Sequence, residues 1–133
     1  MNKISFVIPC YNSSKTIESV VNEIVTTVNK RDDEYEIILV NDCSTDDVWN
    51  VIKKLRKDNR RIKGICFSKN FGQHSALMAG YNKASGDIVV SLDDDGQTPA
   101  DEVYSLIDKL NEGYDVVYAS YDHKQHSSAR NLG

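Results

Sequence analysis

The sequence lacks several features that would place it in a familiar class. No apolar run in its 133 residues approaches the roughly 20 residues that a membrane-spanning helix needs. The first apolar run turns at Pro9 without a small-residue cleavage site, so no signal peptide is predicted and we expect a cytoplasmic protein. A net charge of −4 lacks the basic surplus of nucleic-acid-binding proteins. Small molecules are therefore the expected partners.

Cysteine is also too sparse to organise the fold. Cys10, Cys43 and Cys66 are odd in number and widely separated, which predicts free thiols rather than a disulfide framework or a zinc site. The chain has no repeat and no low-complexity tract, and its 40% hydrophobic residues suffice for one core. A single domain is expected.

What the chain does contain is a regular alternation of predicted strands and helices. Apolar runs rich in β-branched residues predict strands at 4–9, 36–40, 62–67, 87–92 and 115–120. Apolar residues at helical spacing predict helices at 17–28, 48–55 and 73–84, and a fourth that starts with Thr98 as N-cap and Pro99 and reaches Leu110. This order predicts an α/β fold with a doubly wound, mainly parallel sheet and helices on both faces.

In such a sheet, ligands bind beyond the carboxyl ends of the strands, so the residues that follow each strand are the informative ones. Acidic and amide side chains collect there, in residues 9–12, 41–46 and 93–99. Neither G-x-G-x-x-G nor G-K-S/T occurs, so a bound phosphate would need another source of positive charge. Three successive carboxylates at 93–95 are hard oxygen ligands suited to Mg²⁺ or Mn²⁺ shared with a diphosphate.

Each of these features also has a purely structural interpretation. Residues 42–47 would serve as a turn before the second helix, with Ser44 and Asp47 forming a capping box. Tyr11 would be an ordinary half-buried aromatic residue, and residues 70–74 a loop that leads into a helix. The carboxylates at 93–95 are harder to explain in this way, because adjacent like charges repel unless a cation or solvent relieves them.

The motifs together resemble the family 2 glycosyltransferases with the GT-A fold, and most closely the branch that includes dolichol-phosphate mannosyltransferase and bacterial polyprenyl-phosphate glycosyltransferases. The segments that carry the resemblance are SFVIPCYN at 5–12, VNDCSTD at 40–46, SKNFGQH at 68–74, AG at 79–80, ASGD at 84–87 and DDDGQTP at 93–99. The last of these contains the D-x-D pattern. The resemblance implies a role in cell-envelope polysaccharide synthesis.

The resemblance implies a nucleoside pocket on one side of the site. Pro9, Tyr11 and Asn12 would shape this pocket, and Asp42 would accept a hydrogen bond from the base, uracil or guanine. Asn70, in the motif at 68–74, is a further candidate for substrate binding. The donor would be a sugar linked to UDP or GDP.

The other side of the site would hold the phosphates and the metal. Asp93 and Asp94 would face the ribose and the phosphates, and Asp95 would bind Mg²⁺ or Mn²⁺ as the catalytic carboxylate. Gln97 would complete the metal shell, for which Asp93 is a further candidate ligand. The resemblance implies sugar transfer with inversion, in which the metal stabilises the charge of the leaving diphosphate.

The resemblance also divides the chain and suggests its acceptor. Residues 1–120 would form the nucleotide-sugar-binding half, and 121–133 would begin the acceptor region, in poorly ordered form. Relatives in this branch usually carry an arginine after the fifth strand, where this chain has residues 119–122 without one. Arg130 would instead meet a lipid phosphate, unless it belongs to a frayed tail.

Several functional hypotheses remain open from the sequence. The acceptor would be a polyprenyl phosphate, with the full-length protein at the cytoplasmic face of the membrane, or else a soluble sugar or growing polysaccharide. A nucleotide-binding module without turnover is the alternative from another class, and a homodimer is possible in each case. A receiver-type signalling module is disfavoured, because Ser68 and Lys69 stand where it would need an aspartate.

Overall fold

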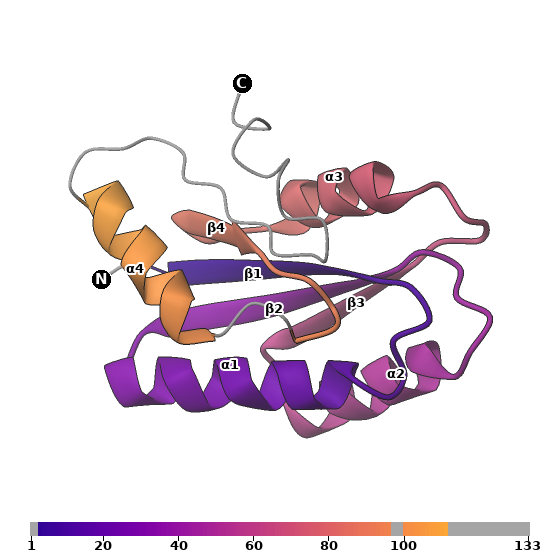
Figure 1. Cartoon of the computed structure of the whole chain (residues 1–133), viewed down its shortest axis with the longest axis horizontal. Helices are drawn as coiled ribbons and strands as arrows, with labels where there is room; N and C mark the ends of the chain where they lie inside the picture. The colour runs from indigo at the N-terminus through magenta and orange to yellow at the C-terminus, as the bar shows by residue number, and fades with distance from the viewer. Residues whose placement is uncertain (1–2, 97–99, 112–133) are drawn as a thin grey trace.

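The structure, a computed structural model of the chain, describes residues 3–96 and 100–111. Strands and helices alternate along these residues (Figure 1). The elements are β1 (Lys3–Cys10), α1 (Ile17–Arg31), β2 (Glu34–Asn41), α2 (Val48–Asp58), β3 (Ile62–Cys66), α3 (Gln73–Lys83), β4 (Ile88–Ser91) and α4 (Ala100–Asn111). The first four predicted strands are confirmed. The fifth, at 115–120, and the predicted helix start at Thr98 and Pro99 lie outside the described residues.

The four strands form one parallel sheet in the order β3-β2-β1-β4. The chain runs outward from β1 to β2 and β3, and then crosses back to add β4 on the other side of β1. The strand order therefore reverses between β1 and β4. A crevice beyond the carboxyl ends of two such strands is where doubly wound sheets bind their ligands.

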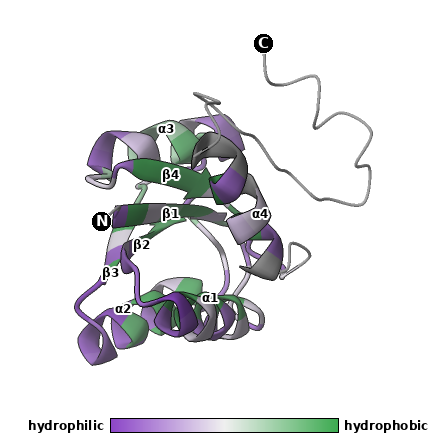
Figure 2. Cartoon of the chain, turned by 90° about the vertical axis from the view of Figure 1, so that its left-hand side faces the viewer, coloured by the Kyte–Doolittle hydropathy of each residue, from purple (hydrophilic) through white to green (hydrophobic). Residues whose placement is uncertain are grey.

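Both faces of the sheet are covered, as the apolar runs predicted. Successive side chains of a strand point to opposite faces, so Ile4, Phe6 and Ile8 of β1 join a core formed with α1, α2 and α4. Val7 points the other way and packs with Ala76 of α3 in a second core. Figure 2 shows α3 on one side of the sheet and α1 and α2 on the other. The predicted doubly wound architecture is confirmed.

The start of α2 differs from the predicted capping box. Asp47 rather than Ser44 occupies the N-cap position, and its side chain caps no backbone amide. The carboxylate of Asp46 instead accepts a hydrogen bond from the Val48 amide at 3.0 Å. The predicted pairing was wrong because the helix begins three residues later than the motif implies.

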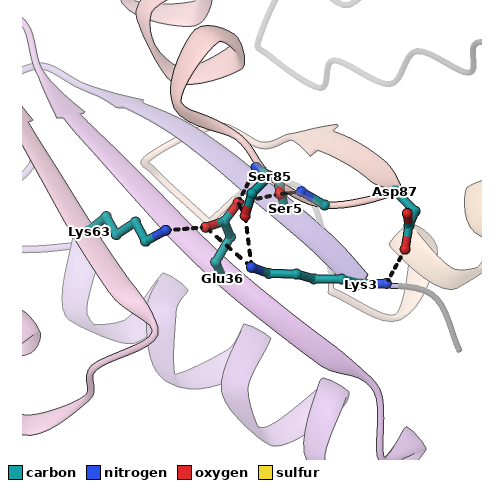
Figure 3. Close-up of polar contacts among 7 residues, drawn as sticks. Lys3, Ser5, Glu36, Lys63, Ser85 and Asp87 are labelled. Atoms are coloured by element: carbon teal, nitrogen blue, oxygen red, sulfur yellow. Dashed lines mark hydrogen bonds and ion pairs between the residues drawn. The ribbon is translucent and has the colours of Figure 1, made fainter.

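A buried carboxylate joins three strands at the edge of the sheet opposite the predicted site (Figure 3). Glu36, only 2% exposed, accepts hydrogen bonds from the Ser5 hydroxyl at 2.6 Å, the Lys63 ammonium at 2.6 Å and the Ser85 amide at 2.7 Å. The Lys3 ammonium lies 3.9 Å from the same carboxylate. These contacts connect β1, β2 and β3 to the segment that precedes β4.

Gly86 allows this segment to approach the sheet. A Cβ atom at Gly86 would lie 2.6 Å from the Ser5 hydroxyl oxygen and 2.7 Å from the Lys3 carbonyl oxygen. The Gly86 amide instead donates to that hydroxyl at 2.8 Å. The motif at 84–87 thus helps to place β4 beside β1. It lies at the edge of the sheet far from the predicted ligands.

The charge of Glu36 predicts an acid-sensitive fold. Burial raises the pKa of Glu36, but hydrogen bonds from Lys63, Ser5 and Ser85 outweigh it and lower the pKa to about 2 from an ordinary 4.5. Because the folded pKa lies below the unfolded one, this stabilisation is complete above about pH 4.5 and is lost as the pH falls through about 2. The total is about 3 kcal/mol.

The measurement is the free energy of unfolding in urea for the wild type and for Glu36→Gln, which cannot ionise. We expect the difference between the two proteins to shrink by about 3 kcal/mol between about pH 7 and about pH 2. Other carboxylates titrate in both proteins and cancel in this comparison. A difference that does not change with pH would show that Glu36 gains nothing from its charge.

Candidate functional site

A pocket of about 400 Å³ opens at the carboxyl ends of the strands, around the point where the strand order reverses. Its lining comes from the last two residues of β1 and from the segments that follow all four strands. The lining residues are Pro9, Cys10, Tyr11, Asp42, Asn70, Gly72, Gln73, Asp93, Asp94 and Asp95. The structure therefore brings together the predicted site residues Pro9, Tyr11, Asp42, Asn70 and 93–95. Gln97 and Arg130 lie outside the described residues.

One wall of the pocket is acidic, and its middle carboxylate supports the neighbouring loop. Asp94 accepts a hydrogen bond from the Tyr11 amide at 2.9 Å, and its carbonyl oxygen accepts one from the Thr16 hydroxyl at 2.7 Å. Burial raises the pKa of the Asp94 carboxyl; the Tyr11 amide opposes this, and the negative charge of Asp95 adds to the rise. Asp95 is exposed, so it is the more accessible of the two carboxylates.

Asn12 joins two loops beside the pocket. Its backbone has the left-handed value φ 52°, a conformation that asparagine tolerates better than most residues. Its side-chain oxygen accepts hydrogen bonds from the Thr45 amide at 2.8 Å and the Asp46 amide at 3.3 Å. The Asn12 amide donates to the Ser44 hydroxyl at 3.0 Å. These bonds fix the position of the adjacent Tyr11, and nucleoside binding by Asn12 itself stays a prediction.

Asp42 is buried at the end of β2, where it contacts the segment that leads into α3. One carboxylate oxygen accepts the Phe71 amide at 2.8 Å and the other accepts the Gly72 amide at 2.9 Å. Asp42 is 4% exposed, yet it lines the pocket. The structure thus gives Asp42 a set of backbone partners that the sequence did not reveal, and the predicted contact with a base stays untested.

Aromatic and amide residues line the pocket together with the carboxylates. Tyr11 is 49% exposed, so a flat ring is available for stacking at the mouth of the pocket. Asn70 and Gln73 add side-chain amides on the side of α3. The lining residues can hold a ligand that has both a planar group and a cation-bound anionic group.

The oxygen ligands of the acidic wall suit a hard divalent cation that is shared with a phosphate. Within residues 3–96 and 100–111, no group of three or more histidine, cysteine, aspartate or glutamate side chains is arranged to hold a metal ion. Asp93, Asp94 and Asp95, which are consecutive in the sequence, all line the pocket. The chemistry of these residues fits Mg²⁺ or Mn²⁺ with part of its shell supplied by a ligand.

Three lining residues were not predicted as site residues: Cys10, Gly72 and Gln73. Cys10 is the last residue of β1, and Gly72 and Gln73 stand at the start of α3. Their positions at the carboxyl-end side of the sheet were the signal that could have identified them. Burial raises the pKa of the Cys10 thiol far above its usual range, with a further contribution from the charge of Asp94. Cys10 is therefore a packing residue rather than a nucleophile. All three cysteines are free, as predicted.

The same architecture occurs in known enzymes. A profile described as Glycosyl transferase family 2 matches residues 5–132. The chain belongs to this family. As a family 2 glycosyltransferase it shares 37% identity over 128 residues with the undecaprenyl-phosphate 4-deoxy-4-formamido-L-arabinose transferase of Proteus mirabilis. The match covers 96% of this chain and 39% of that protein, so the chain spans well under half of its relative's length.

Solved structures confirm the GT-A fold of this glycosyltransferase. The mannosyltransferase PcManGT of Pyrobaculum calidifontis, solved in complex with GDP-Man and Mn²⁺, superposes with a TM-score of 0.74 at 22% identity, covering 88% of this chain and 34% of its own. The glucosyl-3-phosphoglycerate synthase of M. tuberculosis has a TM-score of 0.65 at 26% identity, with 88% and 43% covered. S. aureus TarS in complex with UDP-GlcNAc has a TM-score of 0.62 at 26% identity, with 80% and 31% covered.

None of the helices in the described part of the chain is long and apolar enough to span a membrane.

Proposed function

We propose that this chain binds a nucleoside diphosphate sugar together with Mg²⁺ or Mn²⁺ and forms the donor side of an inverting glycosyltransferase. The observation that carries the proposal is the shared pocket: the carboxylates that follow β4 line it together with Tyr11 and Asp42. The pocket lies where the order of a doubly wound sheet reverses. Solved neighbours in complex with GDP-Man and Mn²⁺ or with UDP-GlcNAc support this assignment.

In the proposed complex, different lining residues bind the base and the cation. The base would stack on the exposed ring of Tyr11. Asp93 and Asp95 would hold the cation, and Gln97, which lies outside the described residues, would be a further ligand. A divalent cation supplies Lewis-acid stabilisation of the charge on the leaving diphosphate. Asp94 holds the Tyr11 backbone amide, so the metal side and the base side are fixed relative to each other. Direct inversion requires no covalent intermediate on the chain.

A polyprenyl phosphate is the proposed acceptor, with the full-length protein at the cytoplasmic face of a membrane. The relative from Proteus mirabilis, named for undecaprenyl phosphate, supports this choice at 37% identity. A non-lipid acceptor is the second candidate, and the neighbour named as a glucosyl-3-phosphoglycerate synthase favours it at 26% identity. Both candidates use the same donor pocket.

Calorimetric titration of the 133-residue chain with UDP and with GDP, in Mn²⁺ and in EDTA, tests the donor site. We expect nucleotide binding that depends on Mn²⁺ and that weakens at least about 10-fold in Asp95→Asn, because the exposed carboxylate that holds the cation is lost. Asp58→Asn removes the same charge from an exposed position at the end of α2 and should bind like the wild type.

Equal affinity of Asp95→Asn and the wild type would contradict the metal role of Asp95. Nucleotide binding that persists unchanged in EDTA would contradict the shared cation.

A further inference from the structure

We infer that the outer side of α2 and the turn that follows it form a docking surface for an anionic lipid membrane. This basic surface consists of six exposed side chains: Lys53, Lys54, Arg56, Lys57, Arg60 and Arg61. The choice of a membrane as the partner rests on the proposed function, in which the acceptor is a lipid phosphate. The surface itself is separate from the donor pocket, since none of the six residues lines it.

The first observation is the concentration of positive charge. Residues 53–63 hold four lysines and three arginines, which are seven of the sixteen basic residues in a chain whose net charge is −4. The same stretch contains a single acid, Asp58. Its seventh cation, Lys63, donates to Glu36 at 2.6 Å and is not part of the basic surface. Positive charge is therefore gathered in one place on an otherwise acidic chain.

The second observation is the arrangement of the charges on α2. The residues that α2 buries lie on one side of the helix: Val48, Ile52 and Leu55. Helical spacing places Lys53, Lys54 and Lys57 on the opposite side, where all three are exposed. Figure 2 shows α2, with its hydrophilic residues in purple, on the face of the sheet opposite α3. The helix thus presents its lysines away from the core.

The third observation is that other side chains do not neutralise these charges. In the part of the chain that the structure describes, no salt bridge includes a residue of the basic surface. Arg61 lies over the uncharged ring of Tyr35, at 5.2 Å from its centre. Lys53 and Lys57 are four residues apart on the helix, and like charges at this spacing destabilise a helix slightly. The fold gains nothing from this cluster, whereas an anionic partner would be attracted by it.

A membrane fits the basic surface better than a nucleic acid does. Clusters of about four to eight lysines and arginines on an amphipathic helix are typical of segments that bind anionic lipids. Nucleic-acid binding is typical of domains with an overall basic surplus, which this chain lacks. The aromatic residue of α2, Trp49, packs its ring against Gly64 of β3 and so does not offer a platform for bases.

The position of the basic surface also suits a lipid acceptor. α2 begins at Val48, directly after the loop at the carboxyl ends of the strands, and runs back over β2 and β3 to Asp58. Lys53 lies five residues from that start, about 8 Å along the helix axis. A membrane in contact with this side of α2 would therefore lie near the carboxyl edge of the sheet without covering the lining residues of the pocket.

Cosedimentation of the 133-residue chain with lipid vesicles tests the basic surface in the absence of nucleotide and of polyprenyl phosphate. Phosphatidylcholine vesicles with about 40% phosphatidylglycerol supply the negative charge, and pure phosphatidylcholine vesicles are the neutral reference. We expect binding to the anionic vesicles alone. Most of this binding should be lost when the salt concentration rises from about 0.1 M to about 1 M, because salt screens contacts between exposed charges.

Charge-reversal variants locate the contact. Lys53→Glu should weaken binding to the anionic vesicles at least about 10-fold, since one cation near such a surface contributes about 5-fold and the reversal adds a repulsion. Lys53→Arg keeps the charge and should bind like the wild type. Lys83→Glu is the matched control, because it reverses an exposed lysine on α3, at the other face of the sheet, and should also bind like the wild type. Arg60→Glu repeats the test in the turn after α2, in case Lys53→Glu does not fold.

Equal weakening by Lys53→Glu and Lys83→Glu would overturn the inference, because net charge alone would then govern binding. A wild type that binds a DNA duplex but not the anionic vesicles would overturn it as well and assign the basic surface to nucleic acid. Titration with UDP and GDP in Mn²⁺ separates this inference from the proposed function. Vesicle binding without nucleotide binding would refute the donor site and leave the docking surface established, whereas nucleotide binding without vesicle binding would overturn the docking surface alone.

Discussion

Replacement of Glu36 by alanine is expected to lower the free energy of unfolding by about 3 kcal/mol at neutral pH. The variant leaves the Ser85 amide and the Ser5 hydroxyl without their shared acceptor in a buried position. Its lysine partners contribute less to the loss, because Lys3 and Lys63 are 33% and 38% exposed and their ammonium groups can rehydrate. A loss of this size is a large fraction of the stability of an ordinary domain.

Urea unfolding followed by circular dichroism measures this loss. Glu34→Ala is the matched control, because Glu34 lies two residues earlier on β2 with an exposed side chain. It should change the unfolding free energy by less than about 0.5 kcal/mol. If the two variants are equally stable, the polar contacts around Glu36 make no net contribution to the free energy of unfolding. The position of β4 beside β1 must then be attributed to packing alone.

This pair of glutamates shows where the sequence stops being informative. Glu34 and Glu36 point to the same face of β2, since side chains of a strand alternate, yet one is exposed and the other is buried. The difference arises because Ser5, Lys63 and Ser85, distant in the sequence, converge on Glu36. No local pattern contains that convergence, and it therefore went unpredicted.

The elements and the location of the site could be predicted, because they follow from local periodicity and from a general rule about parallel sheets. Runs of β-branched residues predicted β1 to β4 to within two residues at each end. The rule that ligands bind beyond the carboxyl ends of strands then gathered Tyr11, Asp42 and the carboxylates at 93–95, which the structure places around one pocket.

The orientation of individual side chains at the site could not be predicted in the same way. The family resemblance implied nucleoside binding by Asn12 and Asp42, and in the structure both side chains accept hydrogen bonds from backbone amides of neighbouring loops. Such partners depend on loop conformations with positive φ at Asn12 and Gly72, which sequence periodicity does not encode. The predicted roles of Gln97 and Arg130 stay predictions, since both residues lie outside the described part of the chain.

The contact between α3 and the centre of the sheet leads to the second large effect. A Cβ atom at Gly80 would lie 2.2 Å from a methyl carbon of Val7, which is fully buried on the central strand β1. Gly80→Ala should therefore destabilise the chain by about 1–3 kcal/mol through overpacking. This outcome opposes the gain of about 1 kcal/mol that alanine brings over glycine inside a helix.

A double-mutant cycle with Val7→Ala separates the steric clash from other effects of the substitution. Val7→Ala alone should cost about 2 kcal/mol by leaving a cavity, and Gly80→Ala added to it should be neutral or stabilising, because the new methyl group occupies the space that Val7 vacated. Asn82→Ala, at an exposed position of the same helix, controls for helix propensity. Additive losses in the double variant would show that α3 moves away from the sheet to relieve the contact. In that case the close approach at Gly80 would not determine where α3 places Gln73 at the pocket.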